Sequence, residues 1–218
     1  MFNFTEILYV LPGIILGLTV HEFCHAFSAY KLGDSTAKDQ GRLTFNPIKH
    51  IDPIGFLFII IARFGWAKPV QFNPANLKHV RRDKAIIAAC GPLSNFLLAV
   101  VLIYTVKGYQ ALIFHSYVSE NWDLFEFLSS EIFQHVLLII LHAIFINLGL
   151  FIFNLIPLPP LDGSHIVFSG LNLKPETEYR IMKIGTPLLF IIIIIQNWTE
   201  ITILPIGFLI NAILGLFL

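Results

Sequence analysis

Residues 16–30 read LGLTVHEFCHAFSAY, an apolar stretch that contains the histidines His21 and His25 and a single charged residue, Glu22. The longer apolar run around it, residues 7–30, is long enough to cross a bilayer, because a helix needs about 20 apolar residues to span roughly 30 Å. A charged side chain at the bilayer centre costs about 2.5–3.5 kcal/mol. The three polar residues therefore indicate a membrane helix that carries a function.

The composition of the whole chain agrees with a membrane protein. Its 218 residues are 56% hydrophobic and 13% charged, against about 25% charged in soluble domains, and the mean hydropathy is +0.76. Lys and Arg together number 14, as do Asp and Glu, so no basic charge favours nucleic acid as a partner. The two cysteines, Cys24 and Cys90, lie in apolar stretches without a CxxC motif, so we expect them to be buried packing residues.

Five apolar runs predict an all-α polytopic membrane protein with one domain over residues 1–218. The runs are residues 7–30, 85–106, 132–161, 179–198 and 201–218. A sixth run, Pro53 to Ala62, is only ten residues long, or about 15 Å as a helix. We therefore expect a short re-entrant segment or a β-hairpin element between the first two crossings.

The basic residues between these runs predict the orientation, because cytoplasmic loops are enriched in Lys and Arg. They number none in residues 1–6, ten in 31–84, one in 107–131, three in 157–183 and none in 197–200. This alternation predicts a multi-pass protein of the cell membrane, surrounded by the lipid bilayer. Its N-terminus would lie outside and its C-terminus in the cytoplasm.

The spacing of the two histidines predicts a metal site. His21 and His25 are four residues apart, so their imidazoles leave one face of the helix and can bind one tetrahedral metal ion. Glu22 lies beside the pair, where it can contact a water on the metal without being a ligand. This HExxH pattern is typical of zinc peptidases, in which the metal lowers the pKa of its water towards about 7 and the Glu is the general base.

A catalytic zinc ion needs a third protein ligand, and Asp162 is the best candidate. It lies in FNLIPLPPLDGSHIVF (residues 153–168), far from any other acidic residue. Counted back from the next basic residue along the chain, His21 and Asp162 lie at similar depths below the cytoplasmic face. The three prolines before Asp162 interrupt the helix, and irregular backbone inside a membrane predicts a cavity, here one that admits water.

HEFCH in the first run together with NLIPLPPLDG at residues 154–163 resembles the site-2 protease family of intramembrane zinc metalloproteases. Three further stretches resemble compact members of that family: GRLTFNPIKHIDPIGF (41–56), GWAKPVQFNPANL (65–77) and AACGPLSNF (88–96). The matching stretches lie in order between residues 21 and 163 of the chain. The length leaves no room for an appended PDZ or CBS domain, so we expect neither.

The resemblance implies a site and a reaction. His21, His25 and Asp162 would bind one Zn²⁺, Glu22 would be the general base, and Asn154 would lie near the site. By residue type, the Asn154 amide can donate to a developing oxyanion or only join two helices. The reaction implied is hydrolysis of peptide bonds in transmembrane protein substrates near the cytoplasmic side of the bilayer. Family substrates are usually single-pass proteins already trimmed outside the membrane, such as membrane-anchored transcription factors or anti-sigma factors.

The resemblance also implies a membrane-associated β element, formed by residues 43–45, Pro53 to Ala62 and residues 70–72. Such an element would hold an unwound substrate by strand pairing. A hairpin that only fills the helix bundle is the alternative.

Several other polar residues have two interpretations. Asn95 is either a substrate contact or a helix-packing residue, and His165 either orients Asp162 or only packs. His135 and His142 are seven residues apart, and we expect them to form hydrogen bonds between helices.

Two other classes of function fit the buried polar residues. One is a metal or proton transporter that uses the same His and Asp side chains, and the other is a catalytically silent protein that binds membrane helices. Glu22 separates these classes, because a transport site has no need of it beside a complete set of ligands.

Overall fold

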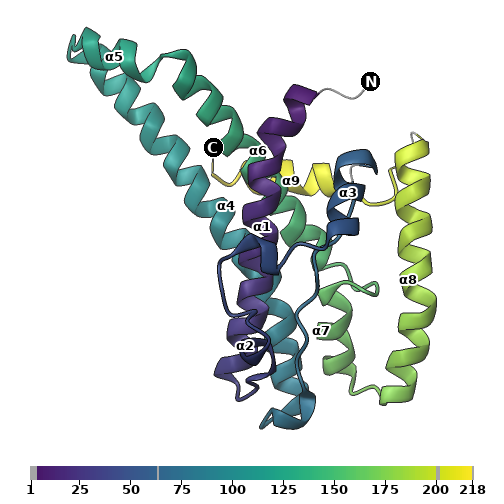
Figure 1. Ribbon diagram of the computed structural model, residues 1–218. Helices are drawn as coiled ribbons and strands as arrows, with labels where there is room; N and C mark the ends of the chain where they lie inside the picture. Colours follow the sequence, from purple (N-terminus) through teal and green to yellow (C-terminus); the bar gives the residue numbers. More distant parts are fainter. Residues whose placement is uncertain (1–3, 63, 200–201, 218) are drawn as a thin grey trace.

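The computed structural model describes residues 4–62, 64–199 and 202–217, and within these ranges the chain is helical and contains no β-strand (Figure 1). The helices are α1 (Phe4–Lys31), α2 (Thr36–Asp39), α3 (Pro53–Ala62), α4 (Val80–Val118), α5 (Trp122–Leu128), α6 (Glu131–Asn154), α7 (Asp162–Leu171), α8 (Pro175–Trp198) and α9 (Ile206–Leu214). Two short 3-10 helices, η1 (Pro47–Lys49) and η2 (Pro74–Asn76), lie in the connection between α1 and α4. The all-α prediction is confirmed.

Helices α1, α4 and α6 form the central bundle, and each is long and apolar enough to cross a membrane. The qualifying segments are Glu6–Lys31, Val80–Val118 and Glu131–Asn154, with 26, 39 and 24 residues. They contain the first two predicted runs and most of the third. α4 continues well beyond the predicted run and, with α5 and the start of α6, forms a hairpin that leans away from the other helices (Figure 1).

The structure does not confirm five crossings. Helix α8 covers the fourth predicted run, but it is not among the three helices that qualify by length and composition. Helix α9 has nine residues, or about 14 Å, less than half of the bilayer core. Residues 201 and 218 of the fifth run lie outside the described residues. The cytoplasmic C-terminus, which depended on a fifth crossing, is therefore not confirmed either.

The predicted β-hairpin is wrong, because Pro53–Ala62 forms the helix α3. Asp52 begins this helix: its Oδ1 accepts a hydrogen bond from the Gly55 nitrogen at 2.8 Å, and Pro53 suits the first helical position. In the described part of the connection, residues 43–45 and 70–72 are not in strands, and the β-pairing is a single antiparallel bridge between Ile51 and Ala67. A strong local start signal therefore outweighs the β propensity of the apolar run.

Small residues bring α1 and α6 close together. A Cβ on Gly13 would lie 2.7 Å from the Ala143 Cα, and one on Gly17 would lie 2.9 Å from the Asn147 Oδ1. Membrane helices commonly pack through such small residues four positions apart. The polar residues one and two turns further along α1 are thereby held against α4 and α6.

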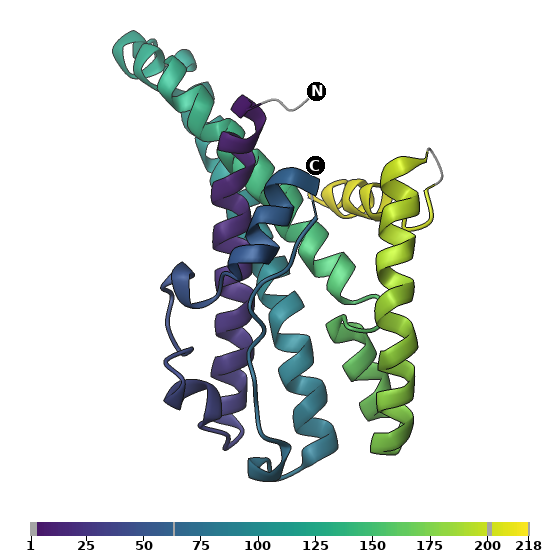
Figure 2. The same ribbon diagram turned by 45° about the vertical axis from the view of Figure 1, so that its right-hand side comes forward.

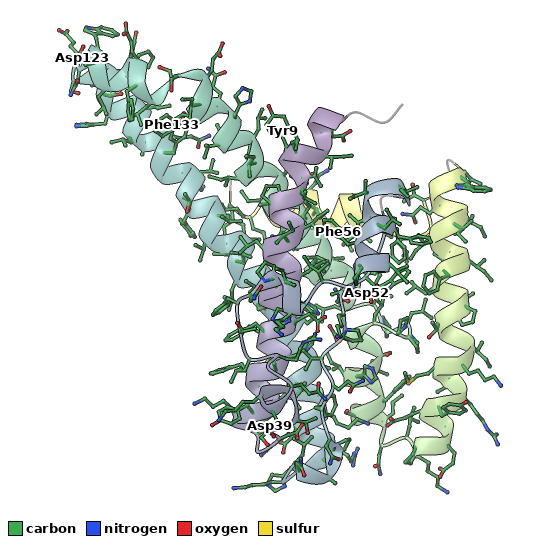
Figure 3. The ribbon with its side chains drawn as sticks, viewed as in Figure 1. Tyr9, Asp39, Asp52, Phe56, Asp123 and Phe133 are labelled. Atoms are coloured by element: carbon green, nitrogen blue, oxygen red, sulfur yellow. The ribbon has the colours of Figure 1, made fainter. Side chains whose placement is uncertain are left out.

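The chain leaves the helical conformation between α6 and α7, where the three prolines were expected to interrupt it. Helix α7 then starts at Asp162 and packs against α4, while α8 makes only small contacts with the other helices (Figures 1 and 2). The labelled side chains Asp39, after α1, and Asp123, in α5, lie near opposite ends of the molecule (Figure 3). Between these ends, α1, α4, α6 and α7 meet around the predicted site residues.

Candidate metal centre

Three predicted ligands converge from two helices that are far apart in sequence. The His21 Nε2 lies 2.9 Å from the His25 Nε2 and 3.1 Å from the Asp162 Oδ2. The His25 Nε2 lies 3.4 Å from the same Asp162 oxygen. Among the described residues, no other group of three or more His, Cys, Asp or Glu side chains gathers in this way.

Helix α4 supports the two imidazoles from behind with a residue that has no side chain. A Cβ on Gly91 would lie 2.7 Å from the His21 Nε2 and closer still to the His25 Nε2. Real Cβ atoms do not approach other atoms so closely, so the two rings pack directly on the α4 backbone. Asp162 reaches the same point from the first turn of α7, which also packs against α4.

Hydrogen bonds at the far side of each ring fix which nitrogen carries the proton. The His21 Nδ1 lies 2.7 Å from the Asn95 Oδ1, and the His25 Nδ1 lies 2.8 Å from the Ile87 carbonyl oxygen. Both oxygens are acceptors, so each Nδ1 must donate and each Nε2 keeps its lone pair. Metal-binding histidines usually make such a second hydrogen bond. The Nε2 lone pairs of His21 and His25 thus both point to the position beside the Asp162 Oδ2.

The donor set fits a zinc ion. The Asp162 Oδ2 is buried and accepts no hydrogen bond within the described residues, although it faces both Nε2 atoms. Two lone pairs and a carboxylate oxygen repel one another at such distances unless a cation lies between them. Two His nitrogens and one carboxylate oxygen are also a ligand set of catalytic zinc sites.

Glu22 lies beside the three candidate ligands and is oriented by contacts with the connection between α1 and α4. Its Oε2 accepts a hydrogen bond from the Val70 nitrogen at 2.9 Å and lies 3.9 Å from the Arg42 Nη2. The Arg42 Nη2 also donates to the Lys68 carbonyl oxygen. Glu22 and Arg42 are both buried. These contacts all use Oε2 and leave the second oxygen of Glu22 available for chemistry.

A largely apolar cavity of about 910 Å³ opens onto the centre. His21, Glu22, His25 and Asp162 all line it. Its apolar walls come from α1, α3, the segment after α3, α6 and α8, and include Val10, Ile59, Phe64, Trp66, Phe153 and Phe190. An apolar cavity with a few convergent polar groups is the usual form of a binding or active site.

The remaining predicted residues lie in different surroundings. Asn154 lines the cavity, but its Nδ2 donates to the Leu150 carbonyl oxygen of its own helix at 2.9 Å. His165 also lines the cavity and packs edge-on against Phe168, without a hydrogen bond to Asp162 in the described structure. Asn95 is fully buried and does not line the cavity, so the structure does not favour direct substrate contact.

Two further predictions concern residues outside the ligand set. Cys24 and Cys90 are half-buried, not buried as expected, and neither belongs to the metal cluster within the described residues. The Tyr9 hydroxyl of α1 lies 2.5 Å from the His135 Nδ1 of α6, which confirms the expected bond between helices for His135. His142 instead bonds the Leu138 carbonyl oxygen of its own helix.

Comparison with known proteins agrees with this geometry. The model of peptidase family M50 matches residues 9–196, a range that includes HEFCH and NLIPLPPLDG. The chain belongs to peptidase family M50. The resemblance to site-2 proteases is thereby confirmed, and the matched range contains every residue that lies at the centre.

Several relatives of this M50 chain carry names that refer to zinc. YwhC of Bacillus subtilis, named for an inferred zinc metalloprotease activity, is 41% identical over 73% of this chain and 67% of its own. Rip2 of Mycolicibacterium smegmatis, named likewise, is 30% identical over 78% of this chain and 59% of its own. Zinc metalloprotease RasP of Oceanobacillus iheyensis is 40% identical over 26% of this chain and 14% of its own. The match to Rip2 thus spans less than two thirds of that relative. No solved structure matches.

Proposed function

We propose that this M50 chain is an intramembrane zinc metalloprotease that hydrolyses peptide bonds of transmembrane protein substrates. One observation carries the proposal: His21, His25 and Asp162 converge beside Glu22 on helices of a membrane bundle. Membership of the M50 family and the names of the relatives support the same reaction. Neither observation favours a transporter.

The protein's own residues have separate roles in the proposed reaction. His21, His25 and Asp162 hold the zinc ion, which when bound supplies a Lewis acid that polarises the scissile carbonyl and activates water. Glu22 is the general base that deprotonates the attacking water, and the contacts to its Oε2 orient it for this proton transfer. Its conjugate acid then passes the proton to the leaving amine.

Asn154 is the proposed donor to the oxyanion. One of its two amide hydrogens is used by the Leu150 carbonyl oxygen, and the second remains for a substrate oxygen in the cavity that Asn154 lines. This role needs only a small change of the side chain, because the residue is already part of the cavity wall.

The cavity supports a membrane-embedded substrate. Its walls are apolar, and α8, one of its sides, makes only small contacts with the helices of the bundle. We propose that cleavage occurs towards the cytoplasmic side of the plasma membrane, because ten Lys and Arg lie in residues 31–84, which follow α1 on the side of the metal centre. This orientation places the N-terminal end of α1 outside, and α8 is the proposed fourth crossing.

The test uses the purified full chain and a model single-pass substrate. Glu22→Gln should keep about one zinc per chain and lose cleavage, whereas Asp162→Ala should lose zinc as well. Cleavage at the wild-type rate by Glu22→Gln would exclude the mechanism, and wild-type zinc in Asp162→Ala would exclude the ligand set. Wild-type protein that moves zinc across liposomes and never cleaves would favour a transporter.

A further inference from the structure

A chain of buried amides leads from the metal centre to α6. The His21 Nδ1 lies 2.7 Å from the Asn95 Oδ1, and the Asn95 Nδ2 donates to the Asn147 Oδ1 at 2.9 Å. Asn95 also donates to the Gly17 carbonyl oxygen at 3.0 Å. Asn95 and Asn147 have no exposed surface and do not line the cavity, so neither contacts a substrate.

The donor and the acceptor of each of these hydrogen bonds are fixed by Asn147, at the α6 end of the series. The Asn147 Nδ2 donates to the Ala143 carbonyl oxygen at 2.8 Å, which turns the Asn147 Oδ1 towards Asn95. With two acceptors on that side, Asn95 must point its NH₂ group at Asn147 and Gly17. Its Oδ1 then faces His21, and an oxygen there accepts a proton only from the Nδ1.

A reversed Asn95 amide would have the opposite effect on the metal centre. Its NH₂ group would face the His21 Nδ1, which would have to accept, so the proton would move to the Nε2. That nitrogen could not bind a metal ion. The orientation of the Asn95 amide thus decides whether His21 is a ligand, and the two acceptors on its other side, the Gly17 carbonyl oxygen and the Asn147 Oδ1, set that orientation together.

We propose that Asn147 is a positioning residue of the metal centre, which acts through Asn95 to fix the tautomer and ring orientation of His21. The inference rests on the proposed function in one respect, the binding of zinc by His21. It assigns to α6, which supplies none of the three proposed metal ligands, an influence on metal affinity that passes through Asn95.

The close packing of α1 on α6 fixes the position of the Asn147 side chain. A Cβ on Gly17 would lie 2.9 Å from the Asn147 Oδ1, so only glycine leaves room for the Asn147 side chain at this crossing. The Gly17 carbonyl oxygen is also the second acceptor of Asn95. The separation of α1 and α6 and the orientation of the Asn95 amide are therefore coupled.

The test measures the zinc dissociation constant of purified full-length variants in detergent, by competition with a chromophoric chelator. Asn147→Leu keeps the size of the side chain and removes the acceptor, and it should weaken zinc binding about 3- to 10-fold. Asn95→Leu should weaken it about 10- to 100-fold, the usual range for loss of such a partner.

The decisive variant carries two substitutions. Asn95→Asp places a carboxylate against the His21 Nδ1, and either of its oxygens accepts the hydrogen bond from the Nδ1, so the direction of that bond no longer depends on Asn147. The second carboxylate oxygen then faces the acceptors of Gly17 and Asn147, so Asn147→Leu removes a repulsion and should not weaken zinc binding further in the Asn95→Asp background. An equal loss of affinity in both backgrounds would overturn the proposal, as would wild-type affinity in Asn147→Leu alone.

Leu148→Ala is the control for simple destabilisation of α6. Leu148 is the neighbour of Asn147, is fully buried, and packs in the apolar cluster of Ala99, Ile103, Ile144 and Ile210. It should lower the melting temperature of the metal-free protein without weakening zinc binding, and a parallel loss of both would overturn the proposal.

Asp162→Ala distinguishes failure of the role of Asn147 from failure of the metal centre. Zinc binding lost there but kept in Asn147→Leu would reject only the role of Asn147, whereas binding kept in Asp162→Ala would reject the metal centre itself.

Discussion

The backbone nitrogen of Val70 donates to the Glu22 Oε2 at 2.9 Å and so joins the loop that follows α3 to the residue beside the proposed metal ligands. Arg42 strengthens the link, because its Nη2 lies 3.9 Å from the same oxygen and donates to the Lys68 carbonyl oxygen. Gly65, Trp66 and other residues of this loop line the cavity. The loop therefore both forms a wall of the cavity and orients Glu22.

Val70→Pro removes this hydrogen bond and should lower the rate of substrate cleavage about 10- to 100-fold, because a hydrogen bond to a charged group contributes about 1.5–3 kcal/mol. The zinc content should stay at the wild-type level, since Val70 does not contact the three ligands. Val70→Ala is the control, because it shortens the side chain and keeps the N–H. Equal rates in the Pro and Ala variants would show that the bond does not orient Glu22.

Gly91→Ala should abolish zinc binding and cleavage, because the new methyl group would lie within 3 Å of the Nε2 atoms of both His21 and His25. Gly108→Ala is a matched control on the same helix, since a Cβ there meets nothing within 4 Å. It should leave zinc binding unchanged and raise the stability by up to about 1 kcal/mol through helix propensity. Metal analysis and thermal unfolding distinguish the two variants, and normal zinc binding by Gly91→Ala would contradict the close packing of α4 on the rings.

The sequence predicted that HEFCH and NLIPLPPLDG lie close together, because the position of a residue within a hydrophobic run indicates its depth in the membrane. His21 and Asp162 were expected at similar depths, and the structure places their side chains 3.1 Å apart. The break after α6 followed from the prolines that precede Asp162, since proline cannot continue a helix ladder.

Other features of the site could not be predicted, because they depend on packing between segments far apart in the sequence. Asn95 is a buried amide whose partner is settled only by the distance between α1 and α4, and 74 residues separate it from His21. The contact of Val70 with Glu22 uses a backbone N–H, which every residue except proline has. The conformation of Pro53–Ala62 was left open between a re-entrant segment and a β-hairpin, because short apolar runs suit strand and helix alike. The capping signal at Asp52 favours the helix that the structure shows.

Lys84 and Glu178 connect α8 to the bundle through an ion pair of 3.0 Å, in which each side chain is 19% exposed. Because α8 makes only small contacts with the other helices, either charge reversal, Lys84→Glu or Glu178→Lys, should lower the melting temperature by about 2–4 °C, equivalent to about 1 kcal/mol. The double reversal should recover most of the loss. Arg180→Ala, at an exposed position of the same helix, should have little effect. Losses that simply add in the double variant would show that the pair contributes no coupling.

Asp34 fixes the end of α1 to the loop that carries η2, and it should make the stability sensitive to acid. Its carboxylate accepts hydrogen bonds from the Thr36 hydroxyl at 2.6 Å, the Asn76 amide at 2.7 Å and the Asn73 nitrogen at 2.8 Å. Burial raises the pKa of Asp34, but these bonds together outweigh it and hold the pKa below its ordinary value of 3.8.

A pKa that is lower in the folded than in the unfolded chain stabilises the fold above the unfolded pKa, and this contribution is lost as the pH falls through the lower folded pKa. Asp34→Asn must turn an NH₂ group towards donors, so it should lower the melting temperature at pH 7 by a few degrees. The difference from the wild type should persist down to about pH 4 and shrink below it. Asp39→Asn, at an exposed position in the same region, should show neither effect (Figure 3). A deficit of Asp34→Asn that stays constant through the acid range would show that the charge of Asp34 does not stabilise the fold.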